Sequence, residues 1–241
     1  IYWAYRDFED MMTLTEAIIS SIVLEIHGKF EIPFENTTLN FQKPWKKLAM
    51  ADAVREYAGI DIYAHTIDHL RDLARQNKLE DWEKSTTHRE FLIQFFEGLV
   101  EEQLIQPTFI HDYPVENSPL AKRHRTKEGF TERFELFIHG MEVGNGFSEL
   151  NDPVDQKARF EDQDEKRRLG DVEAQMIDYD FINALGYGMP PTGGVGIGID
   201  RLVMLLTNNI SIKEVILFPS MKKLQEEEGD PEESAPDRKN P

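Results

Sequence analysis

The chain has 241 residues, 40% of them hydrophobic, which is enough for one sizeable core. It contains no cysteine, so disulfide bonds and thiolate metal sites are excluded. Its 45 acidic residues outnumber the 27 basic ones, giving a formal net charge of −18. Proteins that grip RNA phosphates carry a basic face, so any such contact is local or lies outside this chain. No apolar run reaches the length of a membrane span, and we expect a cytoplasmic location without membrane contact.

The first forty residues are expected to form a helix followed by a hairpin. Residues 7–26 carry apolar side chains at helical spacing, and Gly28 is a typical stop signal at their end. Two short alternating runs, 31–34 and 38–41, then flank a turn and predict a hairpin.

Residues 49–105 are expected to form a helical insertion within a sheet. One helix begins at Ile67, after the cap residue Thr66, and another covers residues 88–104. Residues 107–111 resume the sheet, so the insertion separates two halves of it. Further helices are expected at 153–168 and 180–185, and no internal repeat is found. The predicted fold class is α+β, with a mostly antiparallel sheet and helices on one side.

A basic cluster occupies residues 122–127, which read KRHRTK. It lies in a predicted loop before the next hairpin. Two interpretations stay open: a solvated loop, or a local patch that contacts the phosphates of a nucleotide or the end of an RNA.

Residues 134–152, FELFIHGMEVGNGFSELND, predict a tight hairpin around His139 and Gly140. With these two residues as the turn, Glu135 lies diagonal to Glu142 on one face, within reach of a shared cation. Paired carboxylates are ligands of the kind that Mg²⁺ takes together with phosphates. The alternative is a solvated strand edge with ordinary glutamates.

Three residues further along this strand share a face, namely Asn145, Phe147 and Glu149. Strict alternation places Glu142 on the opposite face from these three. For both sets to line one pocket, the strand must slip by one residue, and Gly144 is the natural site for such a bulge.

Residues 191–201 read PTGGVGIGIDR, with glycines at alternate positions. Strand periodicity places Gly194, Gly196 and Gly198 on one face, where a flat group such as a purine ring has room to lie. The aliphatic residues between and after them, Val195, Ile197 and Ile199, are expected on the other face. Asp200 is the predicted cap of a following helix, and Arg201 is then available to phosphates. Neither the dinucleotide fingerprint nor the phosphate-loop motif fits this spacing, and a glycine-weakened strand with a solvated arginine is the alternative.

Two runs carry a family resemblance: EVGNGFSELNDP at 142–153 and PPTGGVGIGIDR at 190–201. Together they resemble class II lysyl-tRNA synthetases of the bacterial type, and the second run is similar to the third signature motif of class II enzymes. Supporting segments lie at 106–110, 118–121, 131–135 and 215–219. One departure is Gly193, where the family commonly has alanine.

The resemblance implies a catalytic domain over residues 1–222, built on the antiparallel active-site sheet of class II synthetases. Residues 223–241 then form an acidic disordered tail. The implied activity is that of a lysine-tRNA ligase, which activates lysine with ATP and transfers it to tRNA(Lys). Mg²⁺ is the implied cofactor, and a homodimer is the implied assembly.

The resemblance also implies roles for ten residues. Those that bind ATP are Gly194, Gly196, Gly198, Arg201, Glu135 and Glu142. Of these, Arg201 is the catalytic residue at the phosphates, and the two glutamates hold the metal. Those that bind lysine are Tyr2, Asn145, Phe147 and Glu149, with the Glu149 carboxylate paired to the ε-ammonium group.

Residues 1–5 resemble the tail of the second strand of motif 2. We therefore expect a fragment that lacks the N-terminal part of the enzyme, including the motif 2 arginine, and that is poorly active alone. Three alternatives stay open: a sister synthetase for another amino acid, a lysine-ligating paralogue that modifies a protein, and a non-catalytic binding module derived from a synthetase.

Overall fold

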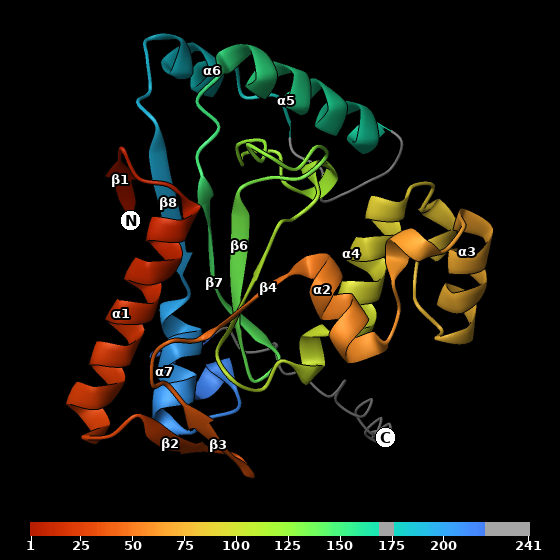
Figure 1. Cartoon of the computed structure of the whole chain (residues 1–241). Helices are drawn as coiled ribbons and strands as arrows, with labels where there is room; N and C mark the ends of the chain where they lie inside the picture. Colours follow the sequence, from red (N-terminus) through yellow and green to blue (C-terminus); the bar gives the residue numbers. More distant parts are fainter. Residues whose placement is uncertain (169–175, 220–241) are drawn as a thin grey trace, which may run out of the picture.

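A computed structural model describes residues 1–168 and 176–219 (Figure 1). Its centre is a six-stranded sheet in the order β1-β8-β7-β6-β5-β4. Within the described residues β4 and β5 run parallel, and the other neighbouring strands are antiparallel. The strands are β1 (Tyr2–Ala4), β4 (Lys46–Ala49), β5 (Thr108–His111), β6 (Arg133–Ile138), β7 (Met141–Ser148) and β8 (Thr192–Ile197). The predicted α+β class with a mostly antiparallel sheet is confirmed.

Helix α1 (Phe8–His27) matches the predicted helix to within one residue. It begins at Asp7, whose side chain forms a capping box with Asp10. A short hairpin of β2 (Glu31–Phe34) and β3 (Thr37–Asn40) follows. Helix α1 and this hairpin pack on one face of the sheet and share a hydrophobic core with β6, β7 and β8. The residues of this core include Met11, Ile19, Phe34, Phe134, Leu136, Val143 and Val195.

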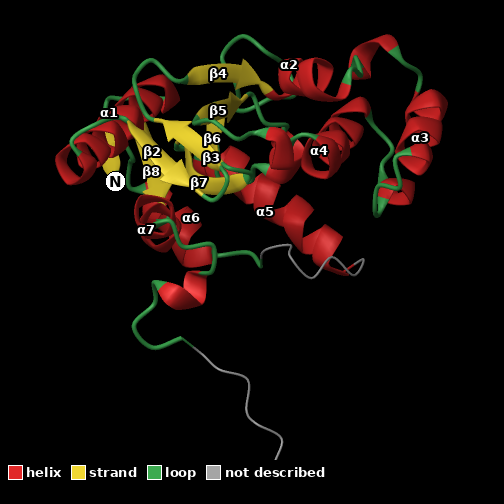
Figure 2. Ribbon diagram, turned by 90° about the horizontal axis from the view of Figure 1, so that it is seen from below, coloured by secondary structure: helices red, strands yellow, loops and turns green. Residues whose placement is uncertain are grey.

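The segment between β4 and β5 is helical, and Figure 2 places it at the opposite end of the sheet from α1. Its elements are α2 (Met50–Ala53), a π-helical turn (Val54–Ala58), α3 (Ile67–Gln76) and α4 (His88–Leu99). Three phenylalanines of α4, Phe91, Phe95 and Phe96, form a second core with Ile110 and Phe137 of the sheet.

Helix α4 ends at Leu99, five residues before the predicted end. A 3-10 turn (Glu101–Gln103) replaces the last part of the predicted helix. The reason is tertiary, because the following backbone bonds the β6–β7 turn. The amide of His139 donates to the carbonyl of Ile105 at 2.9 Å, and that of Gly140 donates to Leu104 at 3.0 Å.

The remaining helices are α5 (Pro153–Arg168), α6 (Tyr179–Gly186) and α7 (Ile199–Thr207). The prediction that Asp200 caps α7 is wrong, because the helix begins two residues earlier with Gly198 as its cap. The amide of Gly198 donates to the Val143 carbonyl at 2.8 Å and so ends the pairing with β7. Ile199 therefore opens the helix and is 65% exposed, so its predicted place on the core face of the strand is also wrong.

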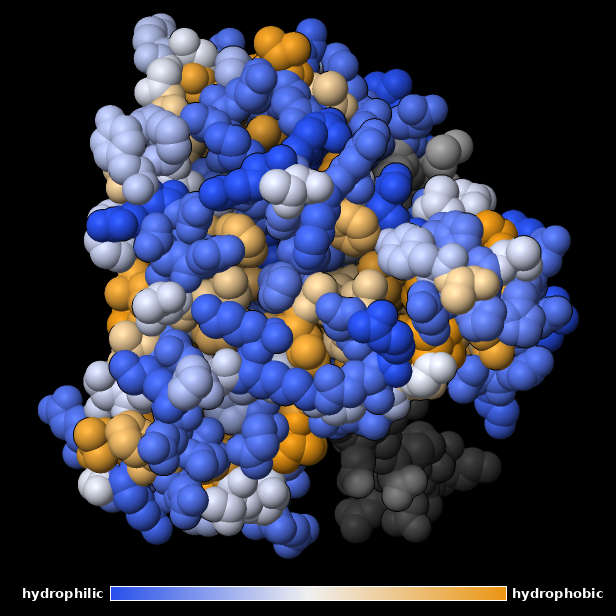
Figure 3. Space-filling view, viewed as in Figure 1, coloured by the Kyte–Doolittle hydropathy of each residue, from blue (hydrophilic) through white to orange (hydrophobic). Residues whose placement is uncertain are grey.

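Hydrophilic residues cover most of the face seen in Figure 3, as the strongly acidic composition requires. No helix in the described ranges is both long and apolar enough to cross a membrane. The acidic tail predicted at residues 223–241 lies outside the residues that the structure describes.

Gly193 lies where α1 crosses β8. A Cβ atom there would lie 2.9 Å from both the carbonyl oxygen of Asp7 and the Cγ of Met11. Glycine at this position therefore lets the helix approach the strand closely.

We expect Gly193→Ala to lower the free energy of unfolding of the intact protein by about 1–3 kcal/mol, since α1 must move. Gly196→Ala is the matched control on the open face of the same strand, where the nearest atom to an added Cβ is 3.9 Å away. The control should change stability by no more than about 0.5 kcal/mol in urea unfolding. Equal losses in the two variants would contradict the packing argument.

Candidate functional site

The β6–β7 hairpin turns at His139 and Gly140, which both have positive φ angles of 53° and 70°. Phe137 pairs with Glu142 as predicted. The register then shifts, so that Leu136 pairs with Gly144. The extra residue is Val143, whose buried side chain belongs to the core. The predicted slip is confirmed, one residue before Gly144.

The bulge brings the two sets of polar residues in β7 to one face. Asn145 pairs with Glu135 across the strands, and its Nδ2 lies 3.3 Å from Glu135 Oε1. Glu142 is close enough to Glu135 for its negative charge to contribute to a raised pKa of Glu135. The neighbouring residues Gly146 and Ser148 face α1 and the core instead.

Glu135 is only 8% exposed, and both of its oxygens are bonded. Oε1 accepts from Arg133 Nη2 at 2.5 Å, and Oε2 accepts from the Tyr113 hydroxyl at 2.8 Å. Burial raises the pKa of Glu135, although the Arg133 guanidinium opposes this effect. The carboxylate is thus held in one orientation at the base of the site.

Arg201 and Glu142 meet at the corner where α7 begins. The Arg201 guanidinium donates to the backbone carbonyl of Glu142, and its Nη1 lies 3.8 Å from the Glu142 carboxylate. Both side chains are partly exposed, at 49% and 39%. They are therefore accessible to an incoming ligand.

A third carboxylate, Glu101, comes to this corner from the end of the helical segment. Burial, together with the charges of Glu97, Glu135 and Glu142, raises the pKa of Glu101 to about 7. No group of three or more histidine and acidic side chains within 1–168 and 176–219 has the geometry of a complete metal site. Two carboxylates nevertheless fit Mg²⁺, which commonly keeps several waters and takes its other ligands from phosphates.

Three of the four residues expected to bind lysine lie around Gly194, while Asn145 pairs with Gly196 further along the strand. A Cβ atom on Gly194 would lie 2.0 Å from Glu149 Oε1 and 3.1 Å from the Tyr2 ring. Glu149, which follows β7, and Tyr2, from β1, therefore converge over the bare backbone of β8. Phe147 is the strand partner of Gly194.

The Glu149 carboxylate is half-buried and has no cationic side chain beside it among the described residues. Burial raises its pKa to about 7. Across the described residues its side chain forms no hydrogen bond or salt bridge with another side chain. A cationic ligand that binds beside a partly desolvated carboxylate of this kind stabilises its ionised form.

The glycine face of β8 is open beyond Gly194. An added Cβ would find its nearest atom 3.9 Å away at Gly196 and 3.5 Å away at Gly198. Val195, between Gly194 and Gly196, is buried in the core on the other face. The predicted alternation is confirmed for Gly194 and Gly196 within β8, whereas Gly198 follows the strand as the cap of α7. A flat strip of backbone lies between Glu149 and Arg201.

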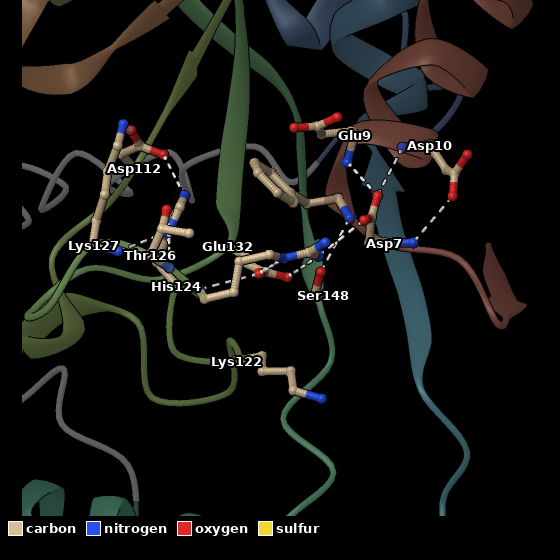
Figure 4. A network of polar contacts seen from close by, with 12 residues as sticks. Asp7, Glu9, Asp10, Asp112, Lys122, His124, Thr126, Lys127, Glu132 and Ser148 are labelled. Carbon is tan, nitrogen blue, oxygen red and sulfur yellow. Dashed lines mark hydrogen bonds and ion pairs between the residues drawn. The ribbon is translucent and has the colours of Figure 1, made fainter.

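The basic cluster at 122–127 is occupied by polar and acidic partners, several of which Figure 4 shows. Arg125 binds Glu132 and Asp7, and Lys127 binds Asp112. Arg123 binds Asp155 at 2.9 Å, and Lys122 donates to Asn151 at 3.1 Å. These contacts brace the loop against α1, β6 and α5, while the side chains of Arg123, Arg125 and Lys127 stay 60%, 58% and 49% exposed. Both interpretations of the cluster therefore stay open.

Comparison with known proteins identifies the family of the chain. The sequence model of a family described as tRNA synthetases class II (D, K and N) matches residues 1–222. The chain belongs to this family. The resemblance to class II lysyl-tRNA synthetases is thereby confirmed.

Three relatives of this class II synthetase chain illustrate the similarity. "Lysine--tRNA ligase 2" of Methanosarcina mazei is 60% identical over 223 residues, and "Lysine--tRNA ligase" of Methanospirillum hungatei is 65% identical over 223 residues. "Lysine--tRNA ligase" of Clostridium novyi is 49% identical over 225 residues. Each match covers 92% of this chain and 44% of the relative, so the chain spans less than half the length of these proteins.

Three residues that the structure places at the candidate site were not identified from the sequence. Arg133 stands two positions before Glu135, so strand parity alone places it on the same face. Tyr113 and Glu101 carry no comparable signal, since they arrive from beyond β5 and from the end of the helical segment.

Glu149→Gln tests the burial of this carboxylate through folding. Its pKa in the fold, about 7, exceeds the ordinary value of 4.5 for a glutamate carboxyl. The stability of the native state therefore falls as pH rises from about 4.5 to 7, because folding disfavours the ionised form. We expect the variant to be more stable than wild type by about 1–3 kcal/mol at pH 8, and the difference to vanish near pH 4. Urea unfolding at both pH values measures this; a difference that is independent of pH would contradict it.

Proposed function

We propose that this chain supplies the lysine- and ATP-binding part of a lysine-tRNA ligase. The reaction forms lysyl-adenylate from lysine and ATP and then esterifies tRNA(Lys). The observation that carries this proposal is the half-buried Glu149 carboxylate, which lies with Tyr2 over Gly194 and has no cationic side chain beside it in the described residues. The names of the relatives support the same substrate.

In the lysine half, Glu149 pairs with the ε-ammonium group of the substrate. Phe147 and Tyr2 flank the methylene groups of the lysine side chain, and Asn145 adds a polar contact to the substrate through its amide. A pocket of this kind rejects uncharged analogues, because their binding leaves the carboxylate buried without a partner.

In the ATP half, Gly194, Gly196 and Gly198 leave room for the adenine ring, and Arg201 binds the phosphates. A lysine carboxylate oxygen attacks the α-phosphorus, and the bond to the departing pyrophosphate breaks. The tRNA ribose hydroxyl then attacks the lysyl carbonyl, and AMP leaves. Positioning and charge neutralisation carry such a reaction, and an arginine that stays protonated suits the leaving phosphates.

Mg²⁺ bound at Glu135 and Glu142 would neutralise charge on the phosphates. The metal, the homodimer and the cytoplasmic location are part of the proposal.

Two other functions remain. Ligation of lysine to a protein uses the same adenylate step, whereas a non-catalytic module would bind lysine or a partner and form no adenylate. A sister synthetase for another amino acid is disfavoured by the relatives, which are lysine--tRNA ligases. Charging of tRNA(Lys) by the intact protein separates the remaining functions. Formation of adenylate without charging would favour the protein-modifying enzyme, and failure to form adenylate would favour the binding module.

Glu149→Gln in the intact protein should weaken lysine binding at pH 8 by about 2–4 kcal/mol, the scale for losing one partner of a buried charge pair. Calorimetry with lysine measures the change, and norleucine, which lacks the ammonium group, is the control ligand. Norleucine should bind the variant at least as well as it binds wild type. Unchanged lysine affinity would remove Glu149 from the site.

Glu142→Gln should raise the Mg²⁺ concentration needed for half-maximal ATP binding by about tenfold or more, since one hard oxygen ligand loses its charge. Lysine affinity without ATP serves as the internal control and should stay within about twofold, because Glu142 lies outside the lysine half. A variant that binds lysine poorly but has a normal Mg²⁺ requirement would contradict the assignment.

A further inference from the structure

Arg133 lies under the site and uses every guanidinium nitrogen. Its Nη2 donates to Glu135 at 2.5 Å, and its Nε lies 3.3 Å from Asn145 Oδ1. Its Nη1 donates to the Asn117 carbonyl at 2.7 Å and to the Ser118 hydroxyl at 3.0 Å. The side chain is 15% exposed. It is therefore held too firmly to reach out as a mobile ligand of substrate.

The Arg133 contacts determine which way the Asn145 amide points. Its Oδ1 faces the Arg133 donor, and its Nδ2 faces the Glu135 acceptor at 3.3 Å. A flipped amide would place its NH2 group against the Arg133 N–H donor and its oxygen against the Glu135 carboxylate, and both contacts would be unfavourable. The second Nδ2 hydrogen is thus left in a defined direction for an acceptor on the substrate.

The same guanidinium joins two residues that face different substrates. Asn145 belongs to the lysine half of the site, and Glu135 belongs to the phosphate half. A planar donor group fixes direction as well as charge, which a lysine ammonium does not. The ring of Tyr113 supports the guanidinium from one face, with 4.6 Å between the Arg133 Cζ and the ring centre.

We propose that Arg133 is a positioning residue that orients Asn145 and Glu135 together and so links lysine binding to the phosphate half. This inference rests on the proposed function. It assigns to Arg133 no contact with substrate, and its effect on lysine passes through Asn145.

Arg159 provides a matched control for a purely structural role. It is buried, with 4% of its side chain exposed, and its Nη1 donates to the Ser118 carbonyl at 3.0 Å. Its other contacts go to Asp155. Arg133 and Arg159 therefore brace the same loop at residues 117–118, but Arg133 also bonds Asn145 and Glu135.

The test compares Arg133→Lys with Arg159→Lys in the intact protein by lysine calorimetry without ATP or metal, beside thermal unfolding. We expect Arg133→Lys to weaken lysine binding about tenfold, the scale for displacing a supporting partner. Arg159→Lys should leave lysine binding within about twofold even when it unfolds at a lower temperature. In an Asn145→Ala background, Arg133→Lys should produce little further loss.

Several results would overturn the inference: lysine affinity unchanged in Arg133→Lys, equal losses in both lysine variants, or additive losses with Asn145→Ala. If Arg133→Lys does not fold, Ser118→Ala removes one acceptor of the guanidinium and should weaken lysine binding about threefold to fivefold, the scale of one hydrogen bond. Unchanged affinity in that variant also overturns it. A wild-type protein that binds no lysine would instead refute the proposed function, so the two failures are distinguishable.

Discussion

One extra residue in β7 determines which side chains share the site. Val143 enters the core between Glu142 and Gly144, and the strand alternation reverses there. Without the bulge, Glu142 would face away from Asn145 and Glu149. The candidate residues for metal binding and for lysine binding share one face of the sheet only because the extra residue, Val143, turns its side chain into the core on the other face.

The second constraint is electrostatic. Glu149 near one end of the glycine strip and Glu101 near the other end are both buried enough to raise their pKa values to about 7. Among the described residues these two carboxylates have no cationic side chain paired with them, while the basic side chains of residues 122–127 pair elsewhere. Substrate ammonium and metal ion would both relieve this excess of negative charge, which is why the site is suited to cationic ligands.

Much of the scaffold could be predicted because its signals are local. The boundaries of α1 follow from its cap residues, and the hairpin register follows from the two-residue turn at His139 and Gly140. The open glycine face follows from strand parity.

The errors came where tertiary contacts override local pattern. Gly198, and not Asp200, caps α7 because its amide bonds Val143, and α4 ends early because the chain turns to bond the hairpin. The ion pairs of the basic cluster were not predicted, because two of its acidic partners, Asp7 and Asp155, are distant in sequence. Of the missed site residues, only Arg133 could have been found, since it shares a strand face with Glu135.

The account depends most directly on Glu149 receiving the ammonium group of lysine. Its carboxyl pKa can be followed by NMR in the intact protein with ¹³C-labelled glutamate, assigned by comparison with Glu149→Gln. The account predicts a pKa of about 7 without ligand. With saturating lysine the value should fall below about 5, because a cation then lies against the carboxylate. A pKa that stays near its ligand-free value while lysine binds would contradict the central claim.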